Sequence, residues 1–347
     1  MKKLIQNYRN LPAQHCGSGA MRNLLYHYCN IDLSEEAVFG LGAGLESIFV
    51  QIQGLNPETI LFGRSISMES DAAFALGVNY LEQPEMDDNK AWEDVKNEVI
   101  KGRPTMLTGD IFFLDYRDYK VRFPAHRFVL LGFDDEKEIA FIADRINQEP
   151  EVCSYGALKK SRNPDTGIST FNLWGKFHST KVKNSLEAAC KIAITASVKR
   201  MTGEDTSQAD LLKSVSPENA VIATGLDGLS RFVRDLENWH EREDRKFMAS
   251  YLSQCIEKFG SGGGNFRKMY AAFLFWAKDL VPDLITDGIV LHAQQSATCW
   301  TELSVLLETA SKEPDKKTIW EQASEKARQI LDTETALFKS LKNNLPV

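Results

Sequence analysis

The feature that most constrains the fold is a change of sequence pattern near residue 180. Before it, short apolar stretches typical of strands alternate with amphipathic helical stretches. After it, helical periodicity dominates. The helices expected there cover residues 186–201, 226–239, 245–259, 266–280, 288–310 and 319–341. This pattern predicts an α+β fold, in which a domain of mixed helices and strands (residues 1–179) precedes an all-helical domain (residues 180–347).

Length and composition fit two globular domains and argue against several other classes. The chain has 347 residues, of which 43% are hydrophobic and 26% are charged, an ordinary balance for globular proteins. Its formal net charge of −7 argues against nucleic acid as a main partner. We find no apolar run of membrane-spanning length and no signal peptide. The sequence therefore predicts a cytoplasmic protein that does not bind membranes.

Cysteine usage singles out one residue. The six cysteines form no CxxC pair and no cluster with histidine, so we expect free thiols and no metal site. Cys16 is followed by Gly17, Ser18 and Gly19 and then by an amphipathic stretch that ends at Cys29. Cys16 should therefore lie at a helix N-terminus, where unpaired N–H groups and the helix dipole stabilise a thiolate. The small residues that follow should leave room for a substrate carbonyl. We interpret Cys16 as a nucleophile.

A histidine and an aspartate could serve this nucleophile. A thiolate works best with an imidazole base, and the base with an orienting carboxylate. His126 opens one expected strand and Asp144 closes the next, across a polar turn near Glu136. If the turn centres on that residue, position 128 faces position 144, and His126 and Asp144 lie diagonally on the same face of the hairpin. The pattern predicts a Cys16–His126–Asp144 triad.

Five further residues or stretches could serve either the site or the fold. Arg64 and Asp110 lie at expected strand ends, where they could bind substrate groups or, equally, form an ion pair or cap a loop. Residues 40–44 are glycine-rich but lack the βαβ frame of a dinucleotide site, so they are interpreted as a close-approach turn near the nucleophile helix, and no cofactor is expected. Residues 260–264 are interpreted as a helix–helix linker rather than a phosphate site. His15 is expected to point away from Cys16 and either to serve the fold or to support a residue of the site without contacting the substrate.

Two sequence segments carry a resemblance to known families. "HCGSGAMRNLLYHY" and "AHRFVLLGFDDEKEIAFIADR" are similar to papain-like cysteine enzymes, especially the double-glycine leader peptidases. Over most of its length the chain resembles the butirosin biosynthesis protein H family more closely. The segments that carry this resemblance are "HCGSGA", "LSEEAVFGLGAGL", "FGRS", "TGDIFFLDY", "AHRFVLLGFD" and, in the helical half, "GSGGGNFRKMYAAFL". The resemblance implies a papain-like N-terminal domain whose cysteine helix packs on an antiparallel sheet.

The resemblance also implies a reaction. The named member of that family moves an aminoacyl group from an acyl carrier protein thioester to an amine of an aminoglycoside. Carried over, Cys16 would accept the acyl group, His126 would act as base and then as acid, and Asp144 would orient His126. The partners implied are an acyl carrier protein, or another pantetheine thioester, and a small amine. Papain-like enzymes usually carry an oxyanion glutamine six residues before the cysteine, which here is Asn10; Gln14 is a second candidate.

Three other functions remain open at this point. The same triad could pass the acyl group to water, as a thioesterase, amidase or peptidase does, because the choice between amine and water depends on how dry the acceptor site is. Cleavage before Cys16 could create an N-terminal nucleophile, but this would leave His126 without a role. Finally, the chain could be a catalytically inactive module that binds a carrier protein or a peptide.

Overall fold

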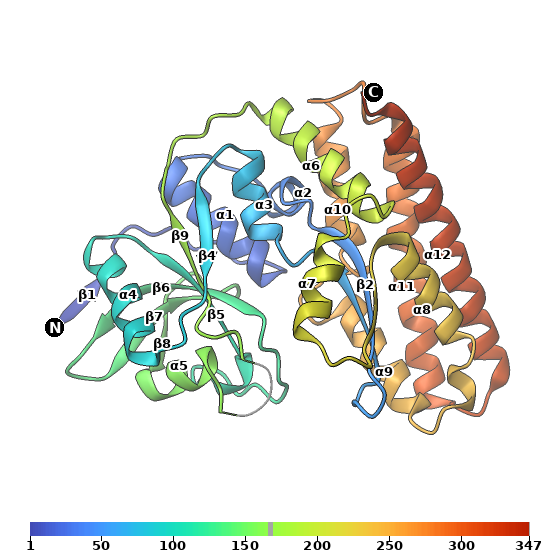
Figure 1. Cartoon of the computed structure of the whole chain (residues 1–347), viewed down its shortest axis with the longest axis horizontal. Coiled ribbons are helices and arrows are strands. Elements are labelled where there is room, and N and C mark those ends of the chain that lie inside the picture. The colour runs from blue at the N-terminus through green and yellow to red at the C-terminus, as the bar shows by residue number, and fades with distance from the viewer. Residues whose placement is uncertain (166–168, 347) are drawn as a thin grey trace. The chain divides into compact units, whose positions relative to one another are not determined.

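The chain divides into two compact units (Figure 1). The computed structural model describes residues 1–165 and 169–346. Unit 1 comprises Met1–Val38 and Gly77–Lys183, and unit 2 comprises Phe39–Leu76 and Asn184–Val347. The chain passes from unit 1 into unit 2 for the last time between Lys183 and Asn184, close to residue 180, where the sequence pattern changes. However, residues 39–76 belong to unit 2, although they lie far from its C-terminal part in the sequence. The α+β fold class is confirmed.

Unit 1 is built on a seven-stranded antiparallel sheet. Its strand order is β4-β9-β5-β6-β7-β8, and β1 pairs with β6. The strands are β1 (Lys2–Leu4), β4 (Tyr80–Gln83), β5 (Thr105–Gly109), β6 (His126–Asp134), β7 (Ile139–Ala143), β8 (Glu151–Ser154) and β9 (Trp174–Phe177). The apolar stretches at residues 105–107, 128–133, 139–142 and 171–177 predict β5, β6, β7 and β9, respectively. It missed β1, β4 and β8, which have only three or four residues each and are too short to show a clear alternation.

The β6–β7 hairpin has the predicted register at the end that matters for the site. Val129 pairs with Ala143 and Leu130 with Ile142, as expected for a turn centred near residue 136. A bulge after Leu130 then shifts the pairing by one residue toward the turn, so that Gly132 pairs with Phe141. Because the bulge lies on the turn side, it leaves the relation between the start of β6 and the end of β7 unchanged.

Helices pack on this sheet in unit 1. They are α1 (Cys16–Cys29), α4 (Asp88–Ile100), the short 3₁₀ helix η1 (Ile111–Phe113) and α5 (Tyr155–Arg162). Helix α1 packs against β6, and it ends at Asn30, which adopts a left-handed conformation (φ 51°). Val95 and Val99 of α4 and Leu158 of α5 join Phe128 of the sheet in one buried cluster. The helix predicted at residues 17–29 is confirmed.

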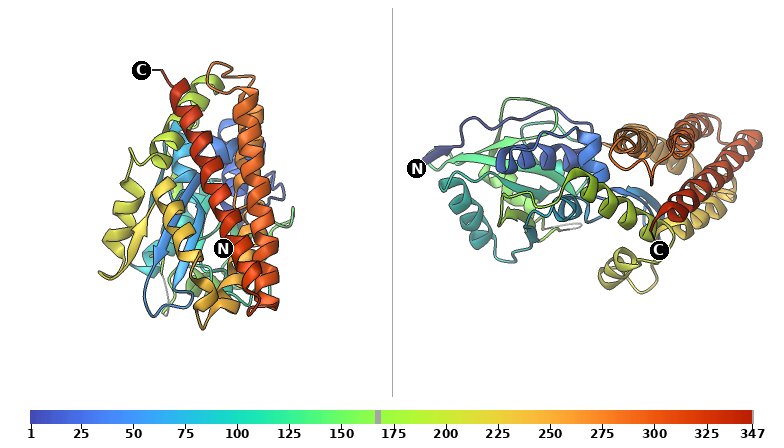
Figure 2. Two further views of the ribbon diagram at one scale, coloured as in Figure 1. Left: turned by 90° about the vertical axis from the view of Figure 1, so that its right-hand side faces the viewer. Right: turned by 90° about the horizontal axis from the view of Figure 1, so that it is seen from above.

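Unit 2 combines a small antiparallel sheet with helices. Its strands, in the order β10-β2-β3, are β2 (Leu45–Gln51), β3 (Thr59–Arg64) and β10 (Val221–Ala223). Its helices are α3 (Met68–Ala75), α6 (Leu186–Met201), α7 (Ser207–Val215), α8 (Gly225–Leu236), η2 (Trp239–Glu241), α9 (Arg245–Glu257), α10 (Arg267–Ala277), α11 (Asp287–Lys312) and α12 (Lys317–Asn344). Helix α2 (Glu35–Leu41) begins in unit 1 and ends in unit 2. The two views of Figure 2 show α11 and α12 side by side.

The C-terminal half is not purely helical, which corrects the expectation of an all-helical region after residue 180. Strand β10 pairs with β2, so that Ile222 lies opposite Val50. Among the described residues after 180, three residues of strand between eight helical segments leave almost no periodic signal. The pairing partner lies about 170 residues earlier in the chain, and such a contact is invisible to local pattern.

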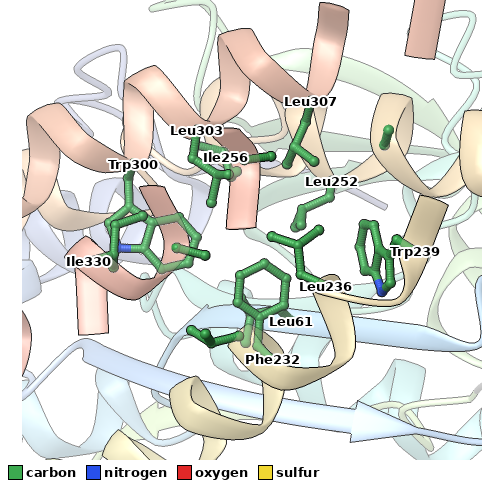
Figure 3. Packing of buried hydrophobic residues seen from close by; sticks show 14 of the residues in the cluster. Leu61, Phe232, Leu236, Trp239, Leu252, Ile256, Trp300, Leu303, Leu307 and Ile330 are labelled. Carbon is green, nitrogen blue, oxygen red and sulfur yellow. The ribbon is translucent and has the colours of Figure 1, made fainter. Parts of the chain in front are cut away.

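The core of unit 2 lies between its sheet and its helices (Figure 3). Leu61 of β3 meets Phe232 and Leu236 of α8, and Trp300 of α11 packs on the same cluster. Ile48 of β2 belongs to a second cluster, which contains residues of α7. Both faces of the small sheet are therefore covered, which explains why β2 is apolar along most of its length.

A buried ion pair ties α10 to α12 within this unit. Arg267 donates from Nε and Nη2 to Glu334 at 2.8 and 2.9 Å, and Nη2 also donates to Oγ of Ser47 at 2.6 Å. Trp300 Nε1 donates to the same carboxylate at 2.7 Å. Arg267 is therefore fully engaged in holding the fold. In the part of the chain that the structure describes, no helix is long and apolar enough to cross a membrane.

Candidate active site

Cys16 is the first residue of α1. His15 is the N-cap, in an extended conformation (φ −116°, ψ 134°), and the N–H groups of the first helical turn have no carbonyl within the helix to donate to. The Cys16 side chain is buried (7% exposed). The structure thus places this thiol at a helix N-terminus, as the sequence pattern predicted.

His126 and Asp144 meet across the β6–β7 hairpin. The Nε2 atom of His126 lies 3.1 Å from both carboxylate oxygens of Asp144, and both side chains are almost completely buried. The Cys16 side chain is hydrogen-bonded to the same imidazole. Because Nε2 faces Asp144, Nδ1 is the nitrogen that remains for the sulfur. The structure brings the three predicted residues together in one buried cluster of unit 1.

The charges in this cluster favour an ionised pair. Burial alone would raise the pKa of the Cys16 thiol, but hydrogen bonds to His126 and His15, together with electrostatic interactions with both, outweigh it and hold the pKa well below its usual value. Burial alone would lower the pKa of His126, but the Asp144 carboxylate reverses the direction and raises it. For Asp144, the effect of burial is outweighed by His126, and its pKa is held low. The arrangement therefore stabilises a thiolate beside an imidazolium.

Three groups besides His126 hold the Asp144 residue in place. The Tyr116 hydroxyl donates to Oδ2 at 2.9 Å, and the backbone N–H of Arg145 donates to Oδ1 at 2.7 Å. On the main-chain side, Asn10 Nδ2 donates to the carbonyl of Asp144 at 2.9 Å. A carboxylate with this many donors keeps both its charge and its direction.

The resemblance to papain-like enzymes made Asn10 a candidate oxyanion donor, but its side-chain amide is engaged in other hydrogen bonds. Its amide nitrogen carries two protons, and these point to the main-chain carbonyls of Asp144, at 2.9 Å, and Asn147, at 2.6 Å. Its oxygen accepts from Asn23 of α1 at 2.9 Å. Asn10 therefore links the nucleophile helix to the end of the hairpin, and in this arrangement neither of its protons is left for an oxyanion. Gln14, the second candidate, is exposed and lies two residues before Cys16.

His15 was expected to point away from Cys16, and the structure contradicts this direction. Its imidazole folds over the start of α1, where Nδ1 accepts from the backbone N–H of Ser18 at 3.1 Å, and it is also hydrogen-bonded to Cys16. Glu35 supports it by accepting from the His15 backbone N–H at 2.8 Å and from the Ser18 hydroxyl at 3.0 Å. The available signal was a histidine directly before a helix, which is weak because histidine is not among the preferred N-cap residues.

The glycine and serine residues after Cys16 also serve the fold. A Cβ atom on Gly19 would lie 2.2 Å from Cβ of Ala13, so a glycine is required there for the preceding segment to cross α1. The small residue at this position is thus explained by packing within unit 1.

The two suggested substrate-binding residues are engaged in other contacts. Arg64 belongs to unit 2 and donates to both carboxylate oxygens of Glu69, at 3.1 and 2.8 Å. Asp110 is buried at the end of β5, where it accepts from the backbone N–H groups of Phe112, at 3.1 Å, and Phe123, at 3.0 Å, and pairs with Arg122. These contacts match the ion-pair and loop-cap alternatives.

The glycines at residues 40–44 form close contacts within unit 2. A Cβ atom on Gly40 would lie 1.8 Å from a ring carbon of Phe273, and one on Gly42 would lie 2.3 Å from the Met68 carbonyl oxygen. The close approaches expected for this stretch are present, and they serve packing.

Two family matches cover most of the chain. Residues 15–145 match the family described as butirosin biosynthesis protein H, N-terminal. Residues 158–341 match a domain of unknown function (DUF4872). A search of curated proteins finds no match. The first match begins at His15 and ends at Arg145, directly after Asp144, and so contains Cys16, His126 and Asp144. The chain therefore belongs to the butirosin biosynthesis protein H family by its N-terminal domain and to the DUF4872 family by the domain that follows.

Proposed function

We propose that this chain is a cysteine-dependent acyltransferase of specialised-metabolite biosynthesis. It would take an acyl or aminoacyl group from a pantetheine thioester, such as that of an acyl carrier protein, and pass it through a Cys16 thioester to an amine. The observation that carries the proposal is the buried hydrogen-bonded cluster of Cys16, His126 and Asp144 at a helix N-terminus. The match to the butirosin biosynthesis protein H family supports a biosynthetic role.

In the first step, the Cys16 thiolate attacks the carbonyl carbon of the donor thioester. The new carbon–sulfur bond forms as the old one breaks, and the leaving pantetheine sulfur takes a proton from the His126 imidazolium. The backbone N–H of Cys16 is the first donor proposed for the oxyanion, and Gln14 is the candidate for the second. The products are an acyl-enzyme, a neutral His126 and free pantetheine thiol.

In the second step, the amine attacks the acyl-enzyme. Neutral His126 accepts the proton that the amine loses, and the amide leaves as the carbon–sulfur bond to Cys16 breaks. Asp144 stabilises the imidazolium that is formed and keeps Nδ1 directed at the sulfur. The thiolate and the imidazolium are thereby restored. Neither step needs a group outside the triad except the oxyanion donors.

The test is a product assay on the full chain. A panel of acyl-pantetheine thioesters is incubated with and without candidate amines, and free thiol, amide and carboxylic acid are measured by chromatography with mass detection. We expect thiol release and amide formation with the natural sequence and neither with Cys16→Ala. Cys29→Ala is the matched control, because burial raises the pKa of Cys29, at the opposite end of α1, to about 11, so its loss should leave turnover intact.

The products separate the proposal from its nearest rival. Carboxylic acid as the sole product, with every amine tested, would show that water is the acceptor and that the chain is a thiol hydrolase. Thiol release that persists in Cys16→Ala would refute the role proposed for this residue.

A further inference from the structure

The Cys16 side chain is hydrogen-bonded to two imidazoles, those of His126 and His15, and the surroundings of these two rings differ. His126 faces the carboxylate of Asp144 through Nε2, whereas His15 faces the backbone of α1 through Nδ1. A histidine that faces a carboxylate is held as a donor at that nitrogen and can carry a positive charge. A histidine that caps a helix must instead accept at the capping nitrogen.

The cap determines which nitrogen of His15 holds the proton. The backbone N–H of Ser18 donates to Nδ1 at 3.1 Å. An amide proton cannot rotate away, and a ring nitrogen has only one lone pair in the plane of the ring. A proton on Nδ1 would therefore face the amide proton directly. The geometry favours a neutral His15 whose proton lies on Nε2.

The neighbours of His15 are consistent with this assignment. The Ser18 hydroxyl lies 3.0 Å from Nδ1 and 3.0 Å from Oε1 of Glu35. Unlike the amide proton, the hydroxyl proton can rotate, and the carboxylate accepts it without any change at His15. The same carboxylate accepts from the backbone N–H groups of Gln14, at 3.0 Å, and His15, at 2.8 Å. Glu35 thus fixes the N-terminal turn of the helix.

We propose that His15 is a neutral hydrogen-bond donor, which directs its Nε2–H at the Cys16 sulfur and takes no part in proton transfer. His126 alone would then move the proton, and His15 would stabilise the negative charge on the sulfur before the acyl group is attached. This inference rests on the proposed function only in taking Cys16 as the reactive thiol. It assigns different roles to His15 and His126, although both are hydrogen-bonded to the Cys16 side chain.

Two substitutions of His15 distinguish its role as the N-cap of α1 from its proposed role as a hydrogen-bond donor to Cys16. His15→Asn places an amide oxygen near the position of Nδ1, so that it can still accept from Ser18, but it removes the donor at the Nε2 position. His15→Gln places an amide nitrogen near the position of Nε2 but loses the cap. Asp87→Ala is the control for stability, because Asp87 caps α4 in the same unit by accepting from the Lys90 backbone N–H at 2.8 Å.

The readouts are the thermal midpoint and the pH dependence of Cys16 alkylation by iodoacetamide, followed on the full chain by peptide mass mapping. We expect His15→Asn to raise the pH midpoint of alkylation by about one unit, a tenfold slower reaction at pH values below the midpoint. His15→Gln should raise it by less than half as much while lowering the thermal midpoint by about 2 °C. Asp87→Ala should lower only the thermal midpoint.

Two results would overturn the inference. An unchanged alkylation midpoint in His15→Asn would show that His15 is a cap and no more. Equal shifts in His15→Asn and His15→Gln would show that the donor at the Nε2 position does not determine the midpoint. If the natural sequence transfers no acyl group but His15→Asn still shifts the midpoint, the proposed reaction fails and this inference stands.

Discussion

Replacing Asp144 by asparagine should destabilise the ion pair between the Cys16 thiolate and the His126 imidazolium. The carboxylate accepts from His126 at 3.1 Å, from Tyr116 at 2.9 Å and from the backbone N–H of Arg145 at 2.7 Å. Asparagine is nearly the same shape but carries no charge. It also offers an N–H₂ group to a site where His126 needs an acceptor, which favours the ring tautomer with its proton on the wrong nitrogen.

The size of the effect follows from the buried contact. An opposite charge at this distance shifts a pKa by about 1–3 units, and each unit corresponds to about 1.4 kcal/mol. Asp144 raises the pKa of His126, and charged His126 helps to lower that of Cys16. In Asp144→Asn, the equilibrium between the neutral pair and the thiolate–imidazolium pair should therefore shift toward the neutral pair by about 10- to 1000-fold.

The assay is the rate of Cys16 alkylation as a function of pH. A group with a lowered pKa stays ionised as the pH falls, so the natural sequence should react almost as fast near pH 6 as near pH 8. Asp144→Asn should react at least about tenfold more slowly near pH 6 and recover in alkaline solution, where the thiol ionises unaided. A matching profile in the two proteins would refute the idea that Asp144 maintains the charge on His126.

Tyr116→Phe is the matched control for this experiment. It removes one hydrogen bond to the Asp144 carboxylate but leaves the negative charge in place. Burial alone would raise the pKa of Asp144, but charged His126 and the backbone N–H of Arg145 outweigh burial and keep it low, so the carboxylate should stay ionised near pH 6. We expect less than about a threefold change in the alkylation rate, because the charge, more than any single hydrogen bond, maintains the imidazolium.

Three further predictions concern stability. Asn10→Ala should lower the unfolding free energy in denaturant by about 2–4 kcal/mol, because it removes the donor to the main-chain carbonyls of Asp144 and Asn147, in the segment that follows β7; full stability with lost turnover would point back to an oxyanion role. Glu334→Gln should cost about 3–5 kcal/mol in the same assay, since Arg267 would remain as a buried unpaired charge; a neutral result would contradict this. Gly40→Ala should cost about 1–3 kcal/mol by thermal unfolding, because the new methyl group would overlap the ring of Phe273, and an unchanged midpoint would show that the ring moves freely.

The parts of the site that sequence could predict are those set by local pattern. Cys16 begins a helix because an amphipathic stretch follows it, and three small residues separate the two. His126 and Asp144 meet because strands have a period of two and the hairpin turn is short, which fixes the register. Local rules of this kind need no knowledge of the rest of the fold.

The parts that sequence could not predict depend on contacts far apart in the chain. Asn10 bonds to the carbonyl of Asp144, 134 residues away, and nothing near Asn10 announces this partner. His15 was expected to point away from Cys16, because regular backbone directs neighbouring side chains apart, but an N-cap residue leaves the regular path and folds its side chain over the helix.

The place of residues 39–76 shows the same limit at the level of the fold. Strands β2 and β3 look like ordinary members of a mixed domain, and their apolar pattern fits any sheet with two covered faces. Their partner β10 and the helices that cover them come from the C-terminal half. Which sheet a strand joins depends on such long-range packing, which a pattern read along the chain does not contain.

The central claim is that Cys16 carries the acyl group as a thioester, and one measurement tests it most directly. The full chain is mixed with an acyl-pantetheine thioester in the absence of amine, quenched in acid and digested, and the mass of each cysteine peptide is determined. The account predicts an acyl adduct on the peptide that contains Cys16, which disappears when amine is added and is absent from Cys16→Ala. An adduct on another cysteine, or amide formed at an undiminished rate by Cys16→Ala, would contradict it.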